Sequence, residues 1–402
     1  MMVSPSKTAD TGYTTPQKKM LLALASAVGL RMLGLFLVLP VFTLYALEFT
    51  SSRLLAGVAF GCYGAAVALT AIPMGRLSDH IGRRKVLLLG MTIFGLGSVI
   101  CAVPVWFPSP IRIDVLIAGR FVQGLGTITA AAFATVADHF PSERRSTAMA
   151  VLGIPIGGAF ALGVIGGPLI AGFLSLQWIF WITAALAFAT VGLLAAFLPD
   201  APPRPAAVAP ITAALRSKPL IALDAGGFLM NVFMTAFWFY LPLILTRKHH
   251  LKMSRFYIVL LPMLVVSGFT MFAFSRGADR GKGRPAGAFA FLLMAVSGVL
   301  LFRPQLAALS PSHLWSVLVP GALFFIGYTG LEPILPSLVS EHAHESAYGT
   351  ALGSFQTFQY LGSFAGGALA GAFSVLPTSV SLAFLLTAGL LGFVLMIAAP
   401  RH

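Results

Sequence analysis

Long apolar segments joined by short connections occupy most of this 402-residue chain. Runs of about 18 or more apolar residues with few charges are typical of helices that cross a membrane. Charged residues make up 9% of the chain, whereas soluble proteins carry about 25%. The sequence therefore predicts an all-α integral membrane protein. Its twelve spans are expected at about residues 21–47, 54–75, 86–107, 113–138, 147–174, 177–198, 219–245, 254–275, 285–302, 314–339, 347–373 and 377–399.

Basic residues are unevenly distributed between the two sides of the predicted bundle. Of 26 lysines and arginines, two lie inside apolar segments and seven in connections on one side, which leaves seventeen on the side of the termini. Cytoplasmic loops carry the excess of Lys and Arg. Both termini are therefore expected in the cytoplasm of a bacterial inner (plasma) membrane. The seven bases on the other side are Arg53, Arg112, Arg247, Lys248, Lys252, Arg255 and Arg303.

Several function classes find no support in the sequence. Because the bases lie in short loops, the net charge of +14 indicates topology and not nucleic-acid binding. The chain has no P-loop, HExxH or GxSxG motif, which argues against an ATP-driven pump and an enzyme. Cys62 and Cys101 lie inside apolar segments as small packing residues, and all eight histidines lie in loops or at helix ends. We therefore expect no metal and no cofactor.

The chain divides into two similar halves. A proline- and alanine-rich linker at 199–216 separates an amino-terminal six-helix bundle (1–198) from a carboxyl-terminal one (217–402). The stretch 136–153 is similar to 339–356, and 75–84 is similar to 275–284, at nearly the same offset. Two parallel six-helix repeats are typical of secondary transporters, which use a gradient and no cofactor.

Three motifs lie in the first half of the chain. The stretch "GRLSDHIGRRK" (75–85) holds one acid among bases, "LIAGRFVQGLGTITA" (116–130) holds an arginine in an apolar run, and "GVIGGPLIAG" (163–172) is rich in glycine. Together they resemble motifs A, B and C of the major facilitator superfamily, in its twelve-helix drug:proton antiporter branch. Members of that branch can carry a further ferredoxin-like domain at the carboxyl end, which we expect this chain to lack.

The resemblance implies roles for individual residues. In motif A (Gly75, Asp79, Gly82, Arg83), Asp79 would cap the helix that begins near 347–350 and lock the two halves while the cavity faces outward. Arg83 would pair with Asp138. The alternative for Asp79 is that it lies in a solvated loop that only sets topology. For Arg84 and Lys85 this is the favoured interpretation. Motif C favours antiport, through Gly163, Gly167, Pro168 and Gly172, although Ile154 replaces its leading glycine. His80 replaces the arginine that usually follows the aspartate.

Four charged residues lie inside apolar segments, where a charge costs about 2.5–3.5 kcal/mol on insertion scales. They are Arg31, Arg120, Asp224 and Glu332, and all four are candidates for proton coupling. Glu332 is the favoured proton carrier, because desolvation favours a protonated carboxyl and a nearby cation favours its release. A structural partner for an arginine is the alternative for Glu332, an interfacial position is favoured for Asp224, and a structural role is equally open for Arg31 and Arg120.

Polar side chains at helical spacing accompany these charges and predict a cavity for cargo. Arg120, Gln123 and Thr127 would share one face of their helix, as would Asp224, Asn231, Thr235 and Trp238. The cavity candidates are Gln123, Thr127, Asn231, Trp238, Tyr328, Gln356, Gln359 and Tyr360. We expect a monomer in the lipid bilayer that exports small amphipathic or drug-like compounds in exchange for protons. A sugar or metabolite exporter is the alternative, and a non-transporting membrane receptor a weaker one.

Overall fold

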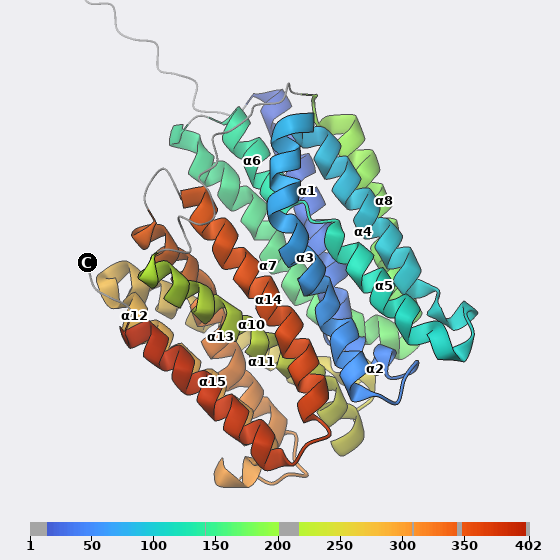
Figure 1. Cartoon of the computed structure of the whole chain (residues 1–402), viewed down its shortest axis with the longest axis vertical. Coiled ribbons are helices and arrows are strands. Elements are labelled where there is room, and N and C mark those ends of the chain that lie inside the picture. The colour runs from blue at the N-terminus through green and yellow to red at the C-terminus, as the bar shows by residue number, and fades with distance from the viewer. Residues whose placement is uncertain (1–13, 141, 201–216, 308, 344–347, 399–402) are drawn as a thin grey trace, which may run out of the picture.

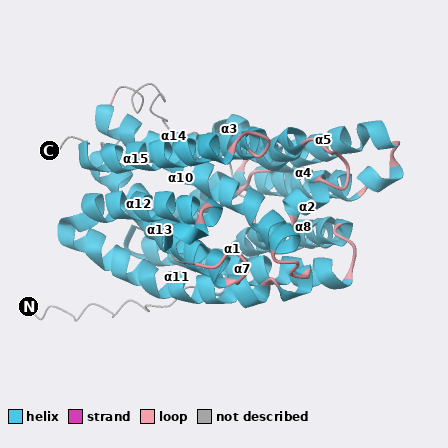
Figure 2. Cartoon of the chain, turned by 90° about the horizontal axis from the view of Figure 1, so that it is seen from below, coloured by secondary structure: helices cyan, strands magenta, loops and turns pink. Residues whose placement is uncertain are grey.

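The computed structural model describes residues 14–140, 142–200, 217–307, 309–343 and 348–398. Regular structure in these ranges is helical, and Figure 2 shows no strand among them. Ten segments are long and apolar enough to cross a membrane. One of them, Met253–Phe302, contains two helices, α11 (Tyr257–Gly277) and α12 (Gly283–Phe302), of membrane-spanning length. With α14 (Tyr348–Phe373) the described helices are consistent with the twelve predicted spans.

The helices fall into two sets on either side of the predicted linker, which lies mostly outside the described residues. The first set is α1 (Thr15–Val38), α2 (Phe42–Ala46), α3 (Arg53–Ile81), α4 (Arg83–Ala102), α5 (Arg112–Leu125), α6 (Thr129–His139), α7 (Ser142–Phe173) and α8 (Gln177–Phe197). The second set is α10 (Lys218–Leu243), α11 (Tyr257–Gly277), α12 (Gly283–Phe302), α13 (Trp315–His342), α14 and α15 (Thr378–Ala398). The short turns are Pro104–Trp106, Ser109–Ile111, Ile244–Lys248, Met253–Arg255, Ala278–Lys282 and Pro304–Ala307.

The fourth predicted span is not one continuous helix, which corrects the expectation for 113–138. It consists of α5 and α6, with residues 126–128 between them outside any helix. Gly126 packs directly on α4, where an added Cβ would overlap the carbonyl oxygen of Gly90 and lie 2.5 Å from the Phe94 nitrogen. The break brings the backbone of α4 and this segment into contact, as only glycine permits.

The two halves repeat each other in local geometry as well as in sequence. The ring of His139 lies 2.9 Å from the Thr135 carbonyl oxygen at the end of α6, and the ring of His342 lies 2.8 Å from the Leu338 oxygen at the end of α13. A glycine with positive φ makes the sharp turn after α3 and another the turn after α11, Gly82 (φ 100°) and Gly281 (φ 74°). The structure therefore confirms two pseudo-symmetric bundles.

The bundles touch closely at one end of the molecule and separate at the other (Figure 1). We call the end where α1 begins and α3 ends the terminal face, and the other end the opposite face. Toward the opposite face, a Cβ at Gly57 of α3 would overlap the carbonyl oxygen of Gly367 of α14. At the terminal face, a Cβ at Gly349 or Gly353 would meet nothing within 4 Å. This conformation is thus open to the terminal face.

Small residues make the close contact possible. A Cβ at Gly61 would lie 2.6 Å from the Phe364 oxygen, and one at Gly371 would overlap the Arg53 oxygen. In lipid the hydrophobic effect does not drive helices together, so association depends on such close van der Waals packing. The glycines of α3 and α14 therefore determine how tightly the opposite face closes.

Candidate functional site

An ion-pair cluster joins three helices of the first bundle at the terminal face. Arg83, the first residue of α4, pairs with Asp79 of α3, and its Nε donates a hydrogen bond of 2.9 Å to Asp138 Oδ2 of α6. Its Nη1 lies 2.5 Å from Ser78 Oγ. The positive φ of Gly82 turns the chain so that Arg83 faces back toward these acids. The structure thus brings together the two residues, Arg83 and Asp138, whose pairing the resemblance implies.

Asp79 also lies at the interface between the bundles. It lines a cavity of about 300 Å³ with Gly75, and with Gly349, Thr350 and Gln356 of α14. Among the described residues no hydrogen bond joins Asp79 to α14 in this conformation. Asp79 is held here by Arg83 and lies across a cavity from the start of α14. The resemblance implies that Asp79 caps this helix in the other conformation, when the central cavity faces outward.

Arg84 makes contacts that the sequence did not predict. Its Nη1 donates a hydrogen bond of 2.6 Å to Asp200, and its Nη2 donates one of 2.7 Å to the Ala195 oxygen. These bonds tie the start of α4 to the end of α8. Arg84 is therefore part of the structure of the first bundle and not only a topological charge.

Two arginines lie buried in the first bundle with a tyrosine between them. Arg31 of α1 is 1% exposed and donates a hydrogen bond of 2.7 Å to the Tyr63 hydroxyl of α3. Arg120 of α5 is 4% exposed, and its guanidinium lies 4.8 Å from the centroid of the Tyr63 ring and 5.0 Å from that of Phe42. Cation–π contact with desolvated rings stabilises such a charge by about 2 kcal/mol. Both guanidinium groups therefore belong to the packed wall.

The polar contacts of Arg120 end within the same bundle. Its Nη1 lies 2.5 Å from Gln123 Oε1, and Gln123 donates a hydrogen bond of 2.8 Å to Ser98 of α4. Gln123 is completely buried, so it contacts protein and not the cavity. Thr127, predicted on the same helical face, lies instead in the non-helical break and is also buried. Neither residue lines the cavity, which corrects that prediction.

The acid near the start of α10 lies in the protein interior. Asp224 is 1% exposed and accepts a hydrogen bond of 2.7 Å from Ser354 of α14. Its other carboxylate oxygen has no hydrogen-bond partner among the described residues. Helix α14 therefore covers this side of α10, and the interfacial position favoured for Asp224 stays a prediction.

The other polar residues of α10 also pack inside the second bundle. Asn231 accepts a hydrogen bond of 3.2 Å from Ser363 and donates one of 3.2 Å to the Gly227 oxygen. Trp238 is 1% exposed, with its ring 5.8 Å from those of Phe237 and Phe325. An aromatic core thus encloses Trp238, and its prediction as a cavity residue is wrong.

Glu332, in the middle of α13, has an exposed surface although the helix around it is largely buried. Tyr328, one turn earlier, interacts electrostatically with this carboxylate. Tyr360 of α14 interacts electrostatically with Glu332 and also with Arg31 and Tyr63 of the first bundle. Gln356, one turn from Tyr360, is exposed, whereas Gln359 is half-buried. The four residues 328, 332, 356 and 360 therefore bring polar groups to the space between the bundles.

The glycines of motif C hold α7 against α1. A Cβ at Gly167 would overlap the Leu37 carbonyl oxygen, and one at Gly163 would lie 2.6 Å from Phe36 Cβ. Pro168 lies inside the continuous helix. Gly172, at the end of α7, packs instead on the second bundle, where a Cβ would lie 2.5 Å from Ser254 Cβ. Motif C therefore permits close packing within one bundle and across the closed opposite face.

Three partners in these networks were missed in the sequence, namely Tyr63, Ser98 and Ser354. Each is a neutral residue in an apolar span, so no charge marks it. The buried charges were the available signal, because a buried charge requires a polar partner on a neighbouring helix. Among the described residues no group of three or more His, Cys, Asp or Glu could hold a metal ion.

A helical bundle of two repeated halves, with polar groups at mid-membrane between them, defines a class of membrane transporter. The model of the major facilitator superfamily matches residues 24–367. The chain belongs to this family and is a multi-pass membrane transporter.

Particular relatives agree with this assignment. The inner membrane transport protein YajR of Escherichia coli is 30% identical over 371 residues, which cover 90% of this chain and 79% of YajR. The 3-(3-hydroxy-phenyl)propionate transporter of Escherichia coli is 28% identical over 82% of each chain. A bacterial homologue of the human lysosomal transporter Spinster superposes with a TM-score of 0.72 at 16% identity, over 96% of each chain, and shows the shared fold.

Proposed function

We propose that this protein is a proton-coupled antiporter that exports small amphipathic compounds by alternating access. The observation that carries the proposal is the position of Glu332. Glu332 is exposed at the middle of a membrane span, where an isolated charge is costly, and it interacts with Tyr360 of α14. Such a group is readily protonated when it is desolvated and loses its proton when a cation approaches. A bound cargo cation and a bound proton can thereby exclude each other at this group.

Tyr328 and Tyr360 fit this role as hydrogen-bonding and stacking groups beside Glu332. Tyr328 is stacked on Phe324 at 5.9 Å, so the carboxylate lies next to an aromatic surface. Aromatic rings and a few polar groups suit flat, amphipathic cargo. Arg31 and Arg120 act as fixed charges in the wall, because each is buried and held by Tyr63.

The unequal distribution of bases supports a cytoplasmic terminal face in a bacterial inner membrane. In that orientation the conformation described above is open to the cytoplasm, where an exporter loads its cargo. Closure of this face would bring Asp79 to the start of α14, where the helix dipole favours an anion. Asp79 would then exchange Arg83 for the helix end and act as a reversible latch. We propose that the protein works as a monomer.

Transport into proteoliposomes tests the proposal, with ethidium as an amphipathic cationic probe. The wild-type protein is expected to accumulate ethidium against its gradient only when a proton gradient is imposed. Glu332→Gln is expected to reduce this accumulation at least about tenfold, the scale of a lost essential proton-transfer group. Glu341→Gln, at the end of the same helix, is the matched control and should transport normally. Unchanged accumulation with Glu332→Gln would contradict the assignment of the carrier.

Transport of aromatic carboxylates is a second candidate function. Arg31 and Arg120 are the cations buried in the described part of the first bundle, and no carboxylate lies within ion-pair distance of either. One relative is named a transporter of an aromatic acid. Uptake or efflux of 3-phenylpropionate, with no movement of ethidium, would favour this candidate. Binding without any counterflow would favour a receptor, and transport of sugars alone would favour a metabolite exporter.

A further inference from the structure

A basic pocket lies at the opposite face, where the two bundles meet. Arg53, Arg247 and Lys248 line it together with Ser374 and Thr378, and its volume is about 230 Å³. Its lining contains no acidic residue. Bases on this side run against the bias that places Lys and Arg in the cytoplasm. The pocket therefore concentrates positive charge where topology does not require it.

These bases have no carboxylate partner among the residues that the structure describes. Ion pairs among the described residues all involve Arg83 or Arg84 at the terminal face. Arg53 donates a hydrogen bond of 2.9 Å to the Ser374 oxygen, which fixes its side chain at the mouth. The turn Ile244–Lys248 presents Arg247 and Lys248 as exposed side chains. The pocket thus holds three cations with unused capacity to bind an anion.

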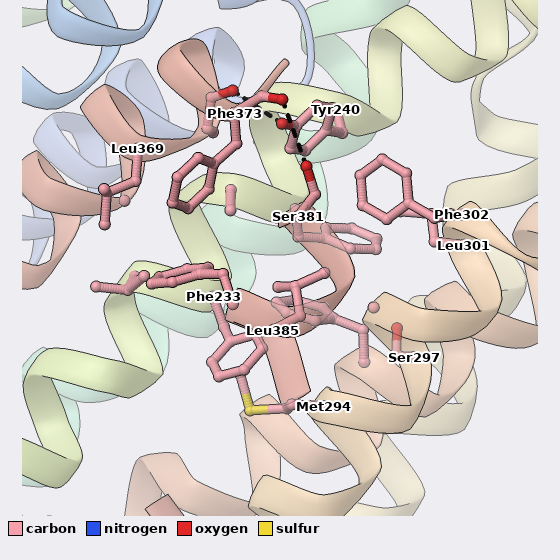
Figure 3. A pocket seen from close by; sticks show the side chains of 18 residues that line it. Phe233, Tyr240, Met294, Ser297, Leu301, Phe302, Leu369, Phe373, Ser381 and Leu385 are labelled. Carbon is pink, nitrogen blue, oxygen red and sulfur yellow. Dashed lines mark hydrogen bonds between the residues drawn. The ribbon is translucent and has the colours of Figure 1, made fainter. Parts of the chain in front are cut away.

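An aromatic cavity adjoins the basic pocket in the second bundle. The two share Tyr240, Phe302, Phe373 and Ser381 as lining residues. Figure 3 shows the side chains that line the aromatic cavity. The aromatic cavity runs along α10 from Tyr240 to Val232, a rise of about 12 Å for eight residues of helix. Its volume of about 40 Å³ admits a few methylene groups of one hydrocarbon chain and excludes a fused ring system.

The hydroxyl groups of this cavity are already used by the protein. Tyr240 donates a hydrogen bond of 2.8 Å to the Ala370 oxygen, and Ser381 donates one of 3.4 Å to the Phe373 oxygen, as the dashed lines in Figure 3 show. Ser297 donates one of 2.6 Å to the Pro320 oxygen. The wall therefore offers an apolar surface to a ligand, while the mouth offers positive charge.

We propose that the basic pocket and the aromatic cavity form one binding site for an anionic phospholipid of the leaflet at the opposite face. The phosphate lies on Arg53, Arg247 and Lys248, and one acyl chain lies along the wall of α10. Arginine binds phosphate through a planar fork and lysine as a point charge. Leu376, 45% exposed at the rim, continues the apolar surface toward the membrane.

The bound lipid would join the two bundles. Arg53 belongs to α3 of the first bundle, whereas Arg247 and Lys248 follow α10 of the second. A phosphate that contacts both stabilises the closed opposite face, and a ligand that prefers one conformation raises its population. The site is separate from the space around Glu332 and does not depend on the proposed transport reaction.

Native mass spectrometry of the full-length protein in detergent tests the site. Phosphatidylglycerol is expected to bind at least about fivefold more tightly than phosphatidylcholine with the same chains, because the bases attract net negative charge. The double variant Arg247→Gln/Lys248→Gln should lose about tenfold in affinity for phosphatidylglycerol. The control Lys252→Gln/Arg255→Gln removes the same charge from exposed positions outside the pocket and should bind as wild type.

Two further arms separate the sources of a phosphate. Dihexanoyl phosphatidylglycerol should bind much more weakly than the long-chain lipid, and millimolar inorganic phosphate should leave the long-chain lipid bound. Displacement by inorganic phosphate would identify a soluble anion as the ligand and overturn the proposal. Equal affinity for the two lipids, or unchanged affinity in the Arg247→Gln/Lys248→Gln variant, would also overturn it.

Discussion

Arg31 donates a hydrogen bond of 2.7 Å to the hydroxyl of Tyr63, whose ring also carries the guanidinium of Arg120 at 4.8 Å. One neutral side chain of α3 thus holds buried cations from α1 and α5. No carboxylate lies within ion-pair distance of either arginine in the described residues. The first bundle therefore carries fixed positive charge, and Tyr360 of α14 interacts electrostatically both with Arg31 and with Glu332.

Tyr63→Phe tests the role of this hydroxyl. The phenyl ring retains the contact with Arg120 but leaves the Arg31 donor without its acceptor. Because a buried donor without a partner costs about 1–3 kcal/mol, the thermal melting temperature in detergent is expected to fall. Tyr257→Phe is the control, since Tyr257 is 42% exposed at the start of α11. Equal melting temperatures for the two variants would contradict a structural role for the Tyr63 hydroxyl.

Ser354→Ala tests the link between α10 and α14. It removes the only hydrogen bond that Asp224 accepts among the described residues, so the buried carboxylate loses its partner. We expect a loss of about 1–3 kcal/mol in the free energy of unfolding. In the double variant with Asp224→Asn the charge is gone, and much of the loss should be recovered. A double-mutant cycle measures this coupling, and additive effects would show that the two residues do not interact.

Gly57→Ala tests how the opposite face closes. The added Cβ overlaps the backbone of α14 at Gly367, so the closed arrangement becomes strained. The expected result is a wider distribution of distances between spin labels placed across the opposite face on α3 and α14. Gly268→Ala is the control, because a Cβ at Gly268 meets nothing within 4 Å. An unchanged distance distribution in Gly57→Ala would show that this contact does not limit closure.

Titration of His249, at the opposite face, is expected to make the stability of the folded protein depend on pH. Burial, with Lys248 as a smaller contribution, lowers the pKa of His249 below its ordinary value of 6.5. The unfolded chain therefore binds more protons than the folded one below about pH 6.5, so stability falls as the pH drops from there toward the folded pKa. In His249→Gln this part of the pH dependence should disappear from melting curves taken between about pH 5 and 7.5. A wild-type slope in the variant would assign the effect to another group.

Much of the architecture could be predicted from the sequence because charge is so rare in it. A basic cluster such as 83–85 marks a helix end, and long apolar runs mark the spans between such ends. The two sequence repeats predicted the two bundles, and the equivalent contacts of His139 and His342 confirm them. The pairing of Arg83 with Asp138 followed from a resemblance and not from spacing.

The surroundings of individual polar residues were harder to predict. In a membrane both the lipid-facing and the packed sides of a helix are apolar, so helical periodicity does not tell one side from the other. Trp238 was therefore misplaced, although its helix was predicted well. The break at 126–128 depends on the close approach of Gly126 to α4, a contact between helices that no local pattern records.

Coupling through Glu332 is the central claim, and a comparison of two transport modes in Glu332→Gln tests it most directly. In proteoliposomes, ethidium counterflow requires only alternation between the two faces, whereas uphill accumulation also requires proton release. We expect Glu332→Gln to retain counterflow near the wild-type rate while uphill accumulation driven by a pH gradient is abolished. Uphill accumulation at the wild-type level in this variant would contradict the account.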